Sequence, residues 1–178
     1  MIGFTFRGKH SYDDFGIVMR SKSRPVLPEK RKRQLDIPGR SGTYDFSGDD
    51  YENRVIVLEC FIDCNAIPAL RQHIRRVAAW LAESGQLTFD DEPNKRYDAR
   101  VYTAVSLEQA MTAGLFTLVF ECQPFAAGDT VSVTAAVTNS GQEISVPYHG
   151  TRPAGCRIVI VNKGTQPLEN FALRIRKE

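Results

Sequence analysis

The stretch "NRVIVLECFID", residues 53–63, decides the fold class of this chain. Between its polar ends, the residues are apolar at both parities, with Glu59 as the one exception. A short apolar run rich in β-branched residues is typical of a strand, and apolar side chains at both parities indicate a position inside a sheet. We therefore predict a central strand here and a mainly β fold around it.

The next residues, 66–85 ("AIPALRQHIRRVAAWLAESG"), carry the one clear helical pattern in the sequence. Its apolar residues recur at helical spacing and form a single stripe: Leu70, Ile74, Val77, Ala78 and Leu81. Asn65 is suited to cap this helix, Pro68 to its first turn and Gly85 to its exit. The stripe has to pack on a sheet, whereas Trp80, beside the stripe, is predicted to lie at a boundary or an interface.

Further strands are predicted near the N-terminus, where Ile2, Phe4 and Phe6 alternate, and in "QLTFD", "RYDARVYTAVSLEQ" and "GLFTLVFECQPF" after the helix. Residues 30–46, "KRKRQLDIPGRSGTYDF", are predicted to form a hairpin, because a glycine-flanked turn at 39–42 joins two strand-like segments. Pro38 restricts the first of these strands to a sheet edge, or marks the end of that strand.

The character of the sequence changes after "QPFAAGDTV", residues 123–131. The segments beyond it are strand-like, polar and rich in turn residues, without a helical pattern. We place a domain boundary near residues 126–128, which divides the chain into residues 1–127 and 128–178. A piece of about 50 residues is marginal for a core of its own. It is therefore either a small β module or the start of a larger β-sandwich.

The overall charge is mild, but its distribution is uneven. A net charge of +2 and a pI near 8.4 argue against nucleic acid as the main partner. Residues 20–33 are strongly basic and residues 44–52 carry only acids. Such blocks suit either a surface that docks on something charged or an ordinary solvated loop. The N-terminus lacks the pattern of a signal peptide, and no run approaches the roughly 18 apolar residues of a membrane span, so no membrane insertion is expected.

The four cysteines do not form a metal motif. Cys60 and Cys64 are the only close pair, and their spacing is not that of a zinc knuckle. A strand would hold them about 13 Å apart, too far for a disulfide. We expect small buried residues in a reducing cytoplasm.

No residue pattern indicates catalysis. The three histidines show no metal-binding or catalytic spacing. The acid clusters at 13–14, 49–50 and 90–92 match neither a calcium loop nor the paired carboxylates of a glycosidase. We interpret "FDDEPNKRYDAR", residues 89–100, as a strand, a charged turn and a strand. The sequence thus predicts no enzyme and no catalytic, cofactor-binding or metal-binding residues, although a cell-wall hydrolase remains an alternative that would rest on these acids.

Five motifs occur in one order along the first domain: "DFGI" at 14–17, "PGRSGTYDF" at 38–46, "AAWL" at 78–81, "FDDEP" at 89–93 and "RYDARV" at 96–101. In these motifs and their order, residues 1–127 resemble the distal tail proteins of long-tailed bacteriophages of Gram-positive hosts and of related prophages. The resemblance implies a β-sandwich with one α-helix and a protruding β-hairpin. Six copies would form a ring that joins the tail tube to the baseplate and host-adsorption hub.

The same resemblance implies the partners and the location. DNA would pass through the bore of the hexameric ring without specific binding. The partners would be the tail tube protein, the tape-measure protein, the tail-associated lysin or hub protein and the receptor-binding protein. The location would be the tail tip of the virion, after synthesis in the host bacterial cytoplasm. Residues 128–178 resemble the start of a galectin-like β-sandwich domain, either partial or reduced.

The hairpin is the predicted ring contact. Its first strand is basic and its second is acidic, so neighbouring copies arranged head to tail have opposite charges to pair. The proposed interface residues are Arg31, Arg33, Asp36, Pro38, Gly39, Arg40, Gly42, Tyr44, Asp49, Asp50 and Glu52. The alternative function is a carbohydrate-binding β-sandwich module on the host surface, resting on residues 128–178, where Tyr148 and Phe171 are the aromatic residues after Phe125.

Overall fold

The computed structural model describes residues 3–62, 67–103 and 115–176. The chain forms two compact units, Met1–Ser132 and Val133–Glu178. Among the described residues, no helix is both long enough and apolar enough to cross a membrane.

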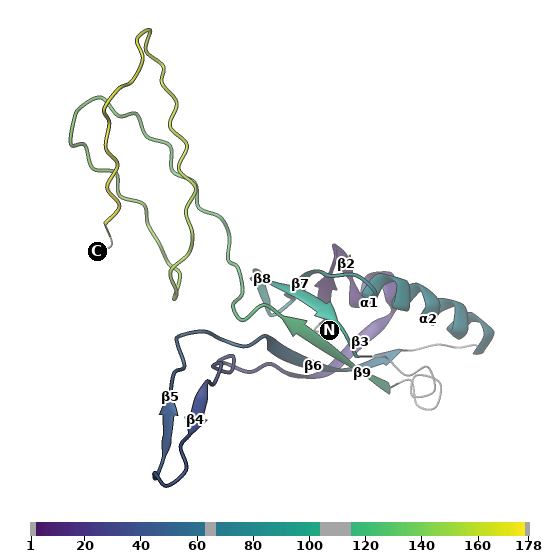
Figure 1. Cartoon of the computed structure of the whole chain (residues 1–178). Coiled ribbons are helices and arrows are strands. Elements are labelled where there is room, and N and C mark those ends of the chain that lie inside the picture. Colours follow the sequence, from purple (N-terminus) through teal and green to yellow (C-terminus); the bar gives the residue numbers. More distant parts are fainter. Residues whose placement is uncertain (1–2, 63–66, 104–114, 177–178) are drawn as a thin grey trace. The chain divides into compact units, whose positions relative to one another are not determined.

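The first unit is built around one antiparallel sheet of seven strands in the order β2-β1-β7-β8-β9-β6-β3 (Figure 1). The strands are β1 (Phe4–Phe6), β2 (Lys9–His10), β3 (Ile17–Ser23), β6 (Arg54–Ile62), β7 (Gly85–Phe89), β8 (Glu92–Val101) and β9 (Leu115–Cys122). A short helix α1 (Ser11–Phe15) joins β2 to β3, and a longer helix α2 (Ile67–Leu81) joins β6 to β7. The mainly β fold with one long helix and a hairpin is confirmed.

The predicted central strand is β6, which pairs with β3 on one side and β9 on the other. Burial alternates along it: the even-numbered side chains are buried, Ile56 and Leu58 completely, whereas Val55 is 46% exposed. The interior position is therefore confirmed, but among the described residues the second apolar face is at most half-buried.

Trp80 lies in the core, only 5% exposed, and not at the boundary where the sequence placed it. Its ring stacks on Phe15 at 4.3 Å between centroids and on Phe4 at 5.9 Å. Its Nε1–H donates a 2.8 Å hydrogen bond to the carbonyl of Phe6, so the indole satisfies its one polar group while buried. The helix is turned so that this large side chain faces the sheet, and Ala78, which has little apolar surface to bury, is exposed.

Pro68 occupies the first turn of α2, as predicted, and Asn65 lies outside the described residues. Gly85 does not mark the helix exit, because α2 ends at Leu81 and Gly85 begins β7. A Cβ at position 85 would lie 2.2 Å from Cγ of Arg7, whose guanidinium crosses there to reach the carbonyl of Trp80 and the carboxylate of Glu83. Glycine is thus needed at position 85 because the Arg7 side chain passes close to its backbone, and not because the helix ends there.

The predicted hairpin is a separate two-stranded sheet of β4 (Gln34–Asp36) and β5 (Thr43–Asp45). Gly39 and Gly42 in its turn have φ of +80° and +83°, a conformation that glycine adopts without strain. Pro38 follows the end of β4, consistent with the expected limit on that strand.

The second unit contains no helix and no strand among its described residues, and all of these residues are exposed. Local contacts shape its loops: Gln142 receives a 3.0 Å hydrogen bond from the amide of Thr138, and Asn162 donates one of 2.8 Å to the carbonyl of Gln166. The strands expected here are absent from the described residues. The boundary at residue 127 and the galectin-like character remain predictions.

Two cysteines provide a test of the core. Burial raises the pKa of the Cys60 and Cys122 thiols to about 12, whereas Cys156 is exposed. In a Cys64→Ser variant, we expect a thiol reagent at pH 8 to modify Cys156 promptly and to leave Cys60 and Cys122 unmodified until the protein unfolds, because the thiolate is the reactive form. Counting labelled sites by mass spectrometry checks this, and rapid native labelling of Cys60 or Cys122 would contradict the core packing.

Candidate assembly interface

The base of the hairpin is closed by ion pairs within the chain. Arg31 binds Glu52 through two nitrogens, at 2.9 and 3.4 Å, and Lys30 lies 3.0 Å from Asp49. The guanidinium–carboxylate contact with Glu52 raises the pKa of Arg31 above its ordinary value. Charges that were expected to pair between neighbouring copies therefore already have partners in their own chain.

The hairpin itself is amphipathic. Leu35 lies opposite Tyr44 in the ladder, and the amide of Phe46 donates 2.8 Å to the carbonyl of Arg33, which extends the same register. Because side chains alternate along strands, one face carries Leu35, Ile37, Tyr44 and Phe46. These four side chains are 39 to 65% exposed. We call them the apolar hairpin face.

The other face of the hairpin is polar, with Gln34 opposite Asp45 and Asp36 opposite Thr43. On the apolar hairpin face, Tyr44 stacks near Phe46 at 6.3 Å, and the guanidinium of Arg40 lies 4.0 Å from the centre of the Tyr44 ring. Every residue from 31 to 46 is exposed. Tyr44 and Arg40 belong to the predicted interface, whereas Leu35, Ile37 and Phe46 were missed. The sequence signal for these three residues was the alternation of polar and apolar residues in "QLDI" and "TYDF", on the two sides of the turn.

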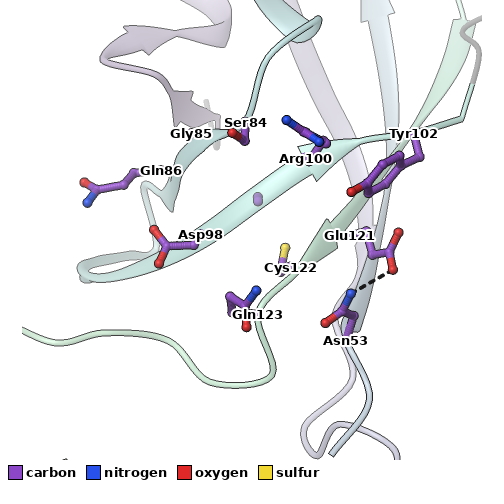
Figure 2. Close-up of a pocket in the computed structure, with 11 residues that line it drawn as sticks. Asn53, Ser84, Gly85, Gln86, Asp98, Arg100, Tyr102, Glu121, Cys122 and Gln123 are labelled. Atoms are coloured by element: carbon purple, nitrogen blue, oxygen red, sulfur yellow. Dashed lines mark hydrogen bonds between the residues drawn. The ribbon is translucent and has the colours of Figure 1, made fainter. Parts of the chain in front are cut away.

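A hollow of about 440 Å³ lies on the outer face of the sheet, over β7, β8 and β9 and beside the start of β6 (Figure 2). The strand register places Gln86, Asp98, Gln123 and Asn53 in one row across it. The next row holds Arg100 and Glu121, with Val55 adjoining. Tyr102, 68% exposed, lies at one end, with the Arg100 guanidinium 5.6 Å from its ring centre. Sequence reasoning did not find this surface, because it combines the β7–β8 pair with residues from β9 and from the start of β6, which are distant in sequence.

The acidic stretch between β7 and β8 forms a charged turn, as predicted. Two of its carboxylates pair with cations from β3 and from the residue after it, and we call this set of ion pairs the clamp. Asp91 pairs with Lys22 and lies 3.5 Å from Arg24, and Glu92 lies 2.7 Å from Arg24. Both cations also lie over the ring of Phe89, at 5.3 and 5.0 Å. In the strand order, three strands separate β3 from β7, so these contacts require the sheet to curl until its edge strand reaches this turn.

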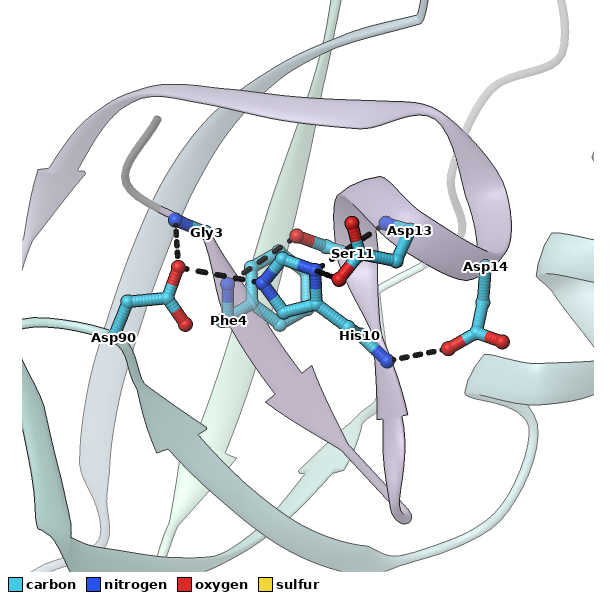
Figure 3. Close-up of polar contacts among 7 residues, drawn as sticks. All are labelled: Gly3, Phe4, His10, Ser11, Asp13, Asp14 and Asp90. Atoms are coloured by element: carbon cyan, nitrogen blue, oxygen red, sulfur yellow. Dashed lines mark hydrogen bonds and ion pairs between the residues drawn. The ribbon is translucent and has the colours of Figure 1, made fainter.

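The neighbouring acids hold the N-terminal segment in place (Figure 3). Asp90 accepts a 2.7 Å hydrogen bond from the amide of Gly3 and lies 3.3 Å from Nε2 of His10. Asp14 accepts one of 2.7 Å from the amide of His10, and Asp13 lies 3.0 Å from Nδ1 of the same ring. Within the described residues, no cluster of three or more such side chains has metal-binding geometry. These carboxylates hold β1, β2 and α1 in place at this edge of the sheet.

Replacing Asp91 by asparagine tests the clamp. The hydrogen bond from Lys22 holds the pKa of Asp91 below its ordinary value of 3.8. A depressed folded pKa gives stability that is present above pH 3.8 and is lost as pH falls through the folded value. Because the side chain is 34% exposed, we expect the variant to lose at most about 1 kcal/mol at pH 7.

The acid dependence separates this effect from a general loss of stability. Urea unfolding between pH 2 and pH 7 should show a shallower acid slope for Asp91→Asn than for the parent protein. Glu143→Gln, which removes an exposed acid in the second unit, should leave the slope unchanged. Equal slopes for Asp91→Asn and the parent protein would contradict the clamp.

Residues 14–122, more than half of the chain, match the family model of the phage tail protein RIFT-related domain. Among solved structures, the chain is similar to SPP1 Dit (gp 19.1), whose crystal structure is described as a paradigm of the hub adsorption apparatus in phages that infect Gram-positive hosts. The match has a TM-score of 0.61 at 18% sequence identity, and it covers 72% of this chain and 52% of that one. No curated protein matches the sequence significantly.

The chain spans about half the length of SPP1 Dit. The expected resemblance to distal tail proteins is confirmed by the family model and by this fold. The match over residues 14–122 shows that the chain belongs to the family of the phage tail protein RIFT-related domain.

Proposed function

We propose that this protein forms a hexameric ring at the distal end of a phage tail, where the ring joins the tail tube to the baseplate and adsorption hub. DNA passes through the bore of the ring without specific binding. The protein contributes shape and contacts, and no catalysis or cofactor is part of this role.

The observation that carries the proposal is the apolar hairpin face, formed by Leu35, Ile37, Tyr44 and Phe46. An isolated two-stranded hairpin is at best marginally stable in water. Exposed apolar side chains gathered on one face favour a second surface that covers them. In a ring, each copy supplies that surface to its neighbour, and the hairpin supplies a contact that a monomer leaves unused.

The predicted interface residues take distinct parts in this arrangement. Arg31 and Glu52 set the base of the hairpin through their paired contact. Gly39 and Gly42 form its turn. Tyr44 and Arg40 form the contact tip, and Asp36 faces the opposite side in the ladder. The number of copies, six, rests on the resemblance to distal tail proteins.

The proposed partners follow from the position of the ring. The tail tube and tape-measure proteins meet it on one side, and the tail-associated lysin or hub protein and the receptor-binding protein on the other. The protein is made in the bacterial cytoplasm and is incorporated into the virion tail tip.

Immunogold labelling of phage particles tests the location directly. Antibodies raised against the purified protein are expected to label the distal end of the tail and no other part of the particle. An antibody against the tail tube protein serves as the control and should label the length of the tube. Labelling of the capsid, or of the whole tube, by the first antibody would overturn the proposed function.

A further inference from the structure

The hollow on the outer face of the sheet combines acidic, polar and apolar groups that are suited to bind another protein surface. Its Asp98 and Glu121 carboxylates lie on either side of Arg100, at positions two residues away on β8 and directly across on β9. Glu121 is held by a 2.9 Å hydrogen bond from Asn53. Within the described part of the chain, the side chains of Gln86, Asp98 and Gln123 make no hydrogen bond. The hollow therefore offers unused polar groups beside the exposed apolar surface of Tyr102 and Val55.

The hairpin has the complementary chemistry. Its apolar face presents Tyr44 with the Arg40 guanidinium stacked on it, and Arg33 shares that face by register. Tyrosine and arginine are the residue types that most often anchor interfaces when they enter a pocket on the partner. The face carries the cations Arg33 and Arg40, whereas the hollow carries two carboxylates and one cation.

We propose that the hollow over β7, β8 and β9 receives the apolar hairpin face of a second copy of this chain. This inference rests on the proposed ring and assigns its acceptor surface. Tyr44 and Phe46 pack against Tyr102 and Val55, and the hairpin arginines face Asp98 and Glu121. The occupant is a neighbouring copy, because residues 31–46 of the same chain are all exposed and do not fill their own hollow.

This pairing has the symmetry that a ring requires. The donor hairpin and the acceptor hollow are different surfaces of one chain, so the contact is heterologous. Each copy donates one hairpin and accepts another, and no donor or acceptor remains unused once the ring closes. An isologous contact of hairpin with hairpin would stop at a dimer.

Disulfide trapping tests the pairing. In a Cys64→Ser/Cys156→Ser background, one protein carries Leu35→Cys in the hairpin and a tagged second protein carries Tyr102→Cys at the hollow. After mixing and mild oxidation, we expect cross-linked heterodimers at least about tenfold in excess of the control pair, because thiols held together have a high effective concentration. The control pairs Leu35→Cys with Gln72→Cys, an exposed position on α2.

A charge variant gives a second measurement that does not depend on disulfide geometry. Glu121→Arg should weaken assembly at least tenfold by placing a second cation where the hairpin arginines dock, whereas Gln72→Arg should not. Equal thermal unfolding of the two variants shows that the fold is kept. If rings form without the cross-link and tolerate Glu121→Arg, the hollow is not the acceptor surface, although the proposed ring is retained. A protein that neither assembles nor cross-links would overturn both.

Discussion

Replacing Trp80 by alanine is expected to destabilise the first unit by about 3–5 kcal/mol, the usual cost of removing a large buried aromatic side chain. Trp80 is 5% exposed and touches the rings of Phe4 and Phe6 in β1 and of Phe15 in α1. The variant also leaves the carbonyl of Phe6 without its indole donor.

Guanidinium unfolding followed by circular dichroism measures this loss, since the variant has lost the only tryptophan and with it the fluorescence signal. Trp80→Phe separates the two contributions: it keeps most of the packing and removes the hydrogen bond, so its loss should fall well below that of alanine. Gln72→Ala, an exposed change on the same helix, is the control and should be nearly neutral. A loss under about 1 kcal/mol for Trp80→Ala would contradict the role of α2 in the core.

Replacing both Tyr44 and Phe46 by serine is expected to weaken assembly at least about 100-fold, since aromatic anchors often contribute about 2 kcal/mol each to an interface. The stability of the monomer should hardly change, because both side chains are exposed and belong to no part of the core. Loss of assembly with an unchanged unfolding curve would be specific to the hairpin contact.

The opposite face of the same hairpin supplies the matched control. Gln34→Ser/Thr43→Ser alters one residue of each of the two polar pairs, Gln34 with Asp45 and Thr43 with Asp36, and should leave assembly intact. Deleting residues 38–43 removes the turn and should abolish assembly altogether. Analytical ultracentrifugation across a concentration series compares these variants. If the deletion variant assembles like the parent protein, the hairpin is not the ring contact.

Local patterns in the sequence were enough to predict β6, the existence and the start of α2, and the glycine-containing hairpin, although the predicted end of α2 at Gly85 was wrong. Each depends on periodicity or turn chemistry within a few residues. The acidic stretch at 90–92 was also identified as a turn from the arrangement of acids beside a proline. The fold class followed from these elements and from the order of the five motifs.

The features that sequence reasoning missed depend on contacts between distant residues. Trp80 was assigned to a boundary because its neighbours in the core, such as Phe6 and Phe15, come from another part of the chain. The contact of Arg7 across Gly85 is equally non-local. The outer hollow joins residues from 53 to 123, and only the strand register brings them together.

The prediction drawn from the charged blocks was incomplete. Their alternating sign suggested pairing between copies, but Arg31 and Glu52 pair within one chain. The apolar face between them, with Leu35 and Tyr44 opposite each other, is the surface that remains uncovered. The side on which a residue lies follows from the ladder register, which the sequence alone did not fix.

Head-to-tail assembly of this chain into a closed ring can be measured in solution. Light scattering across a concentration series, with negative-stain images of any large species, gives the mass and the symmetry. We expect a single species of six times the monomer mass and images with six-fold symmetry. A mass that stays at the monomer at every concentration, both alone and mixed with tail tube protein, would contradict it.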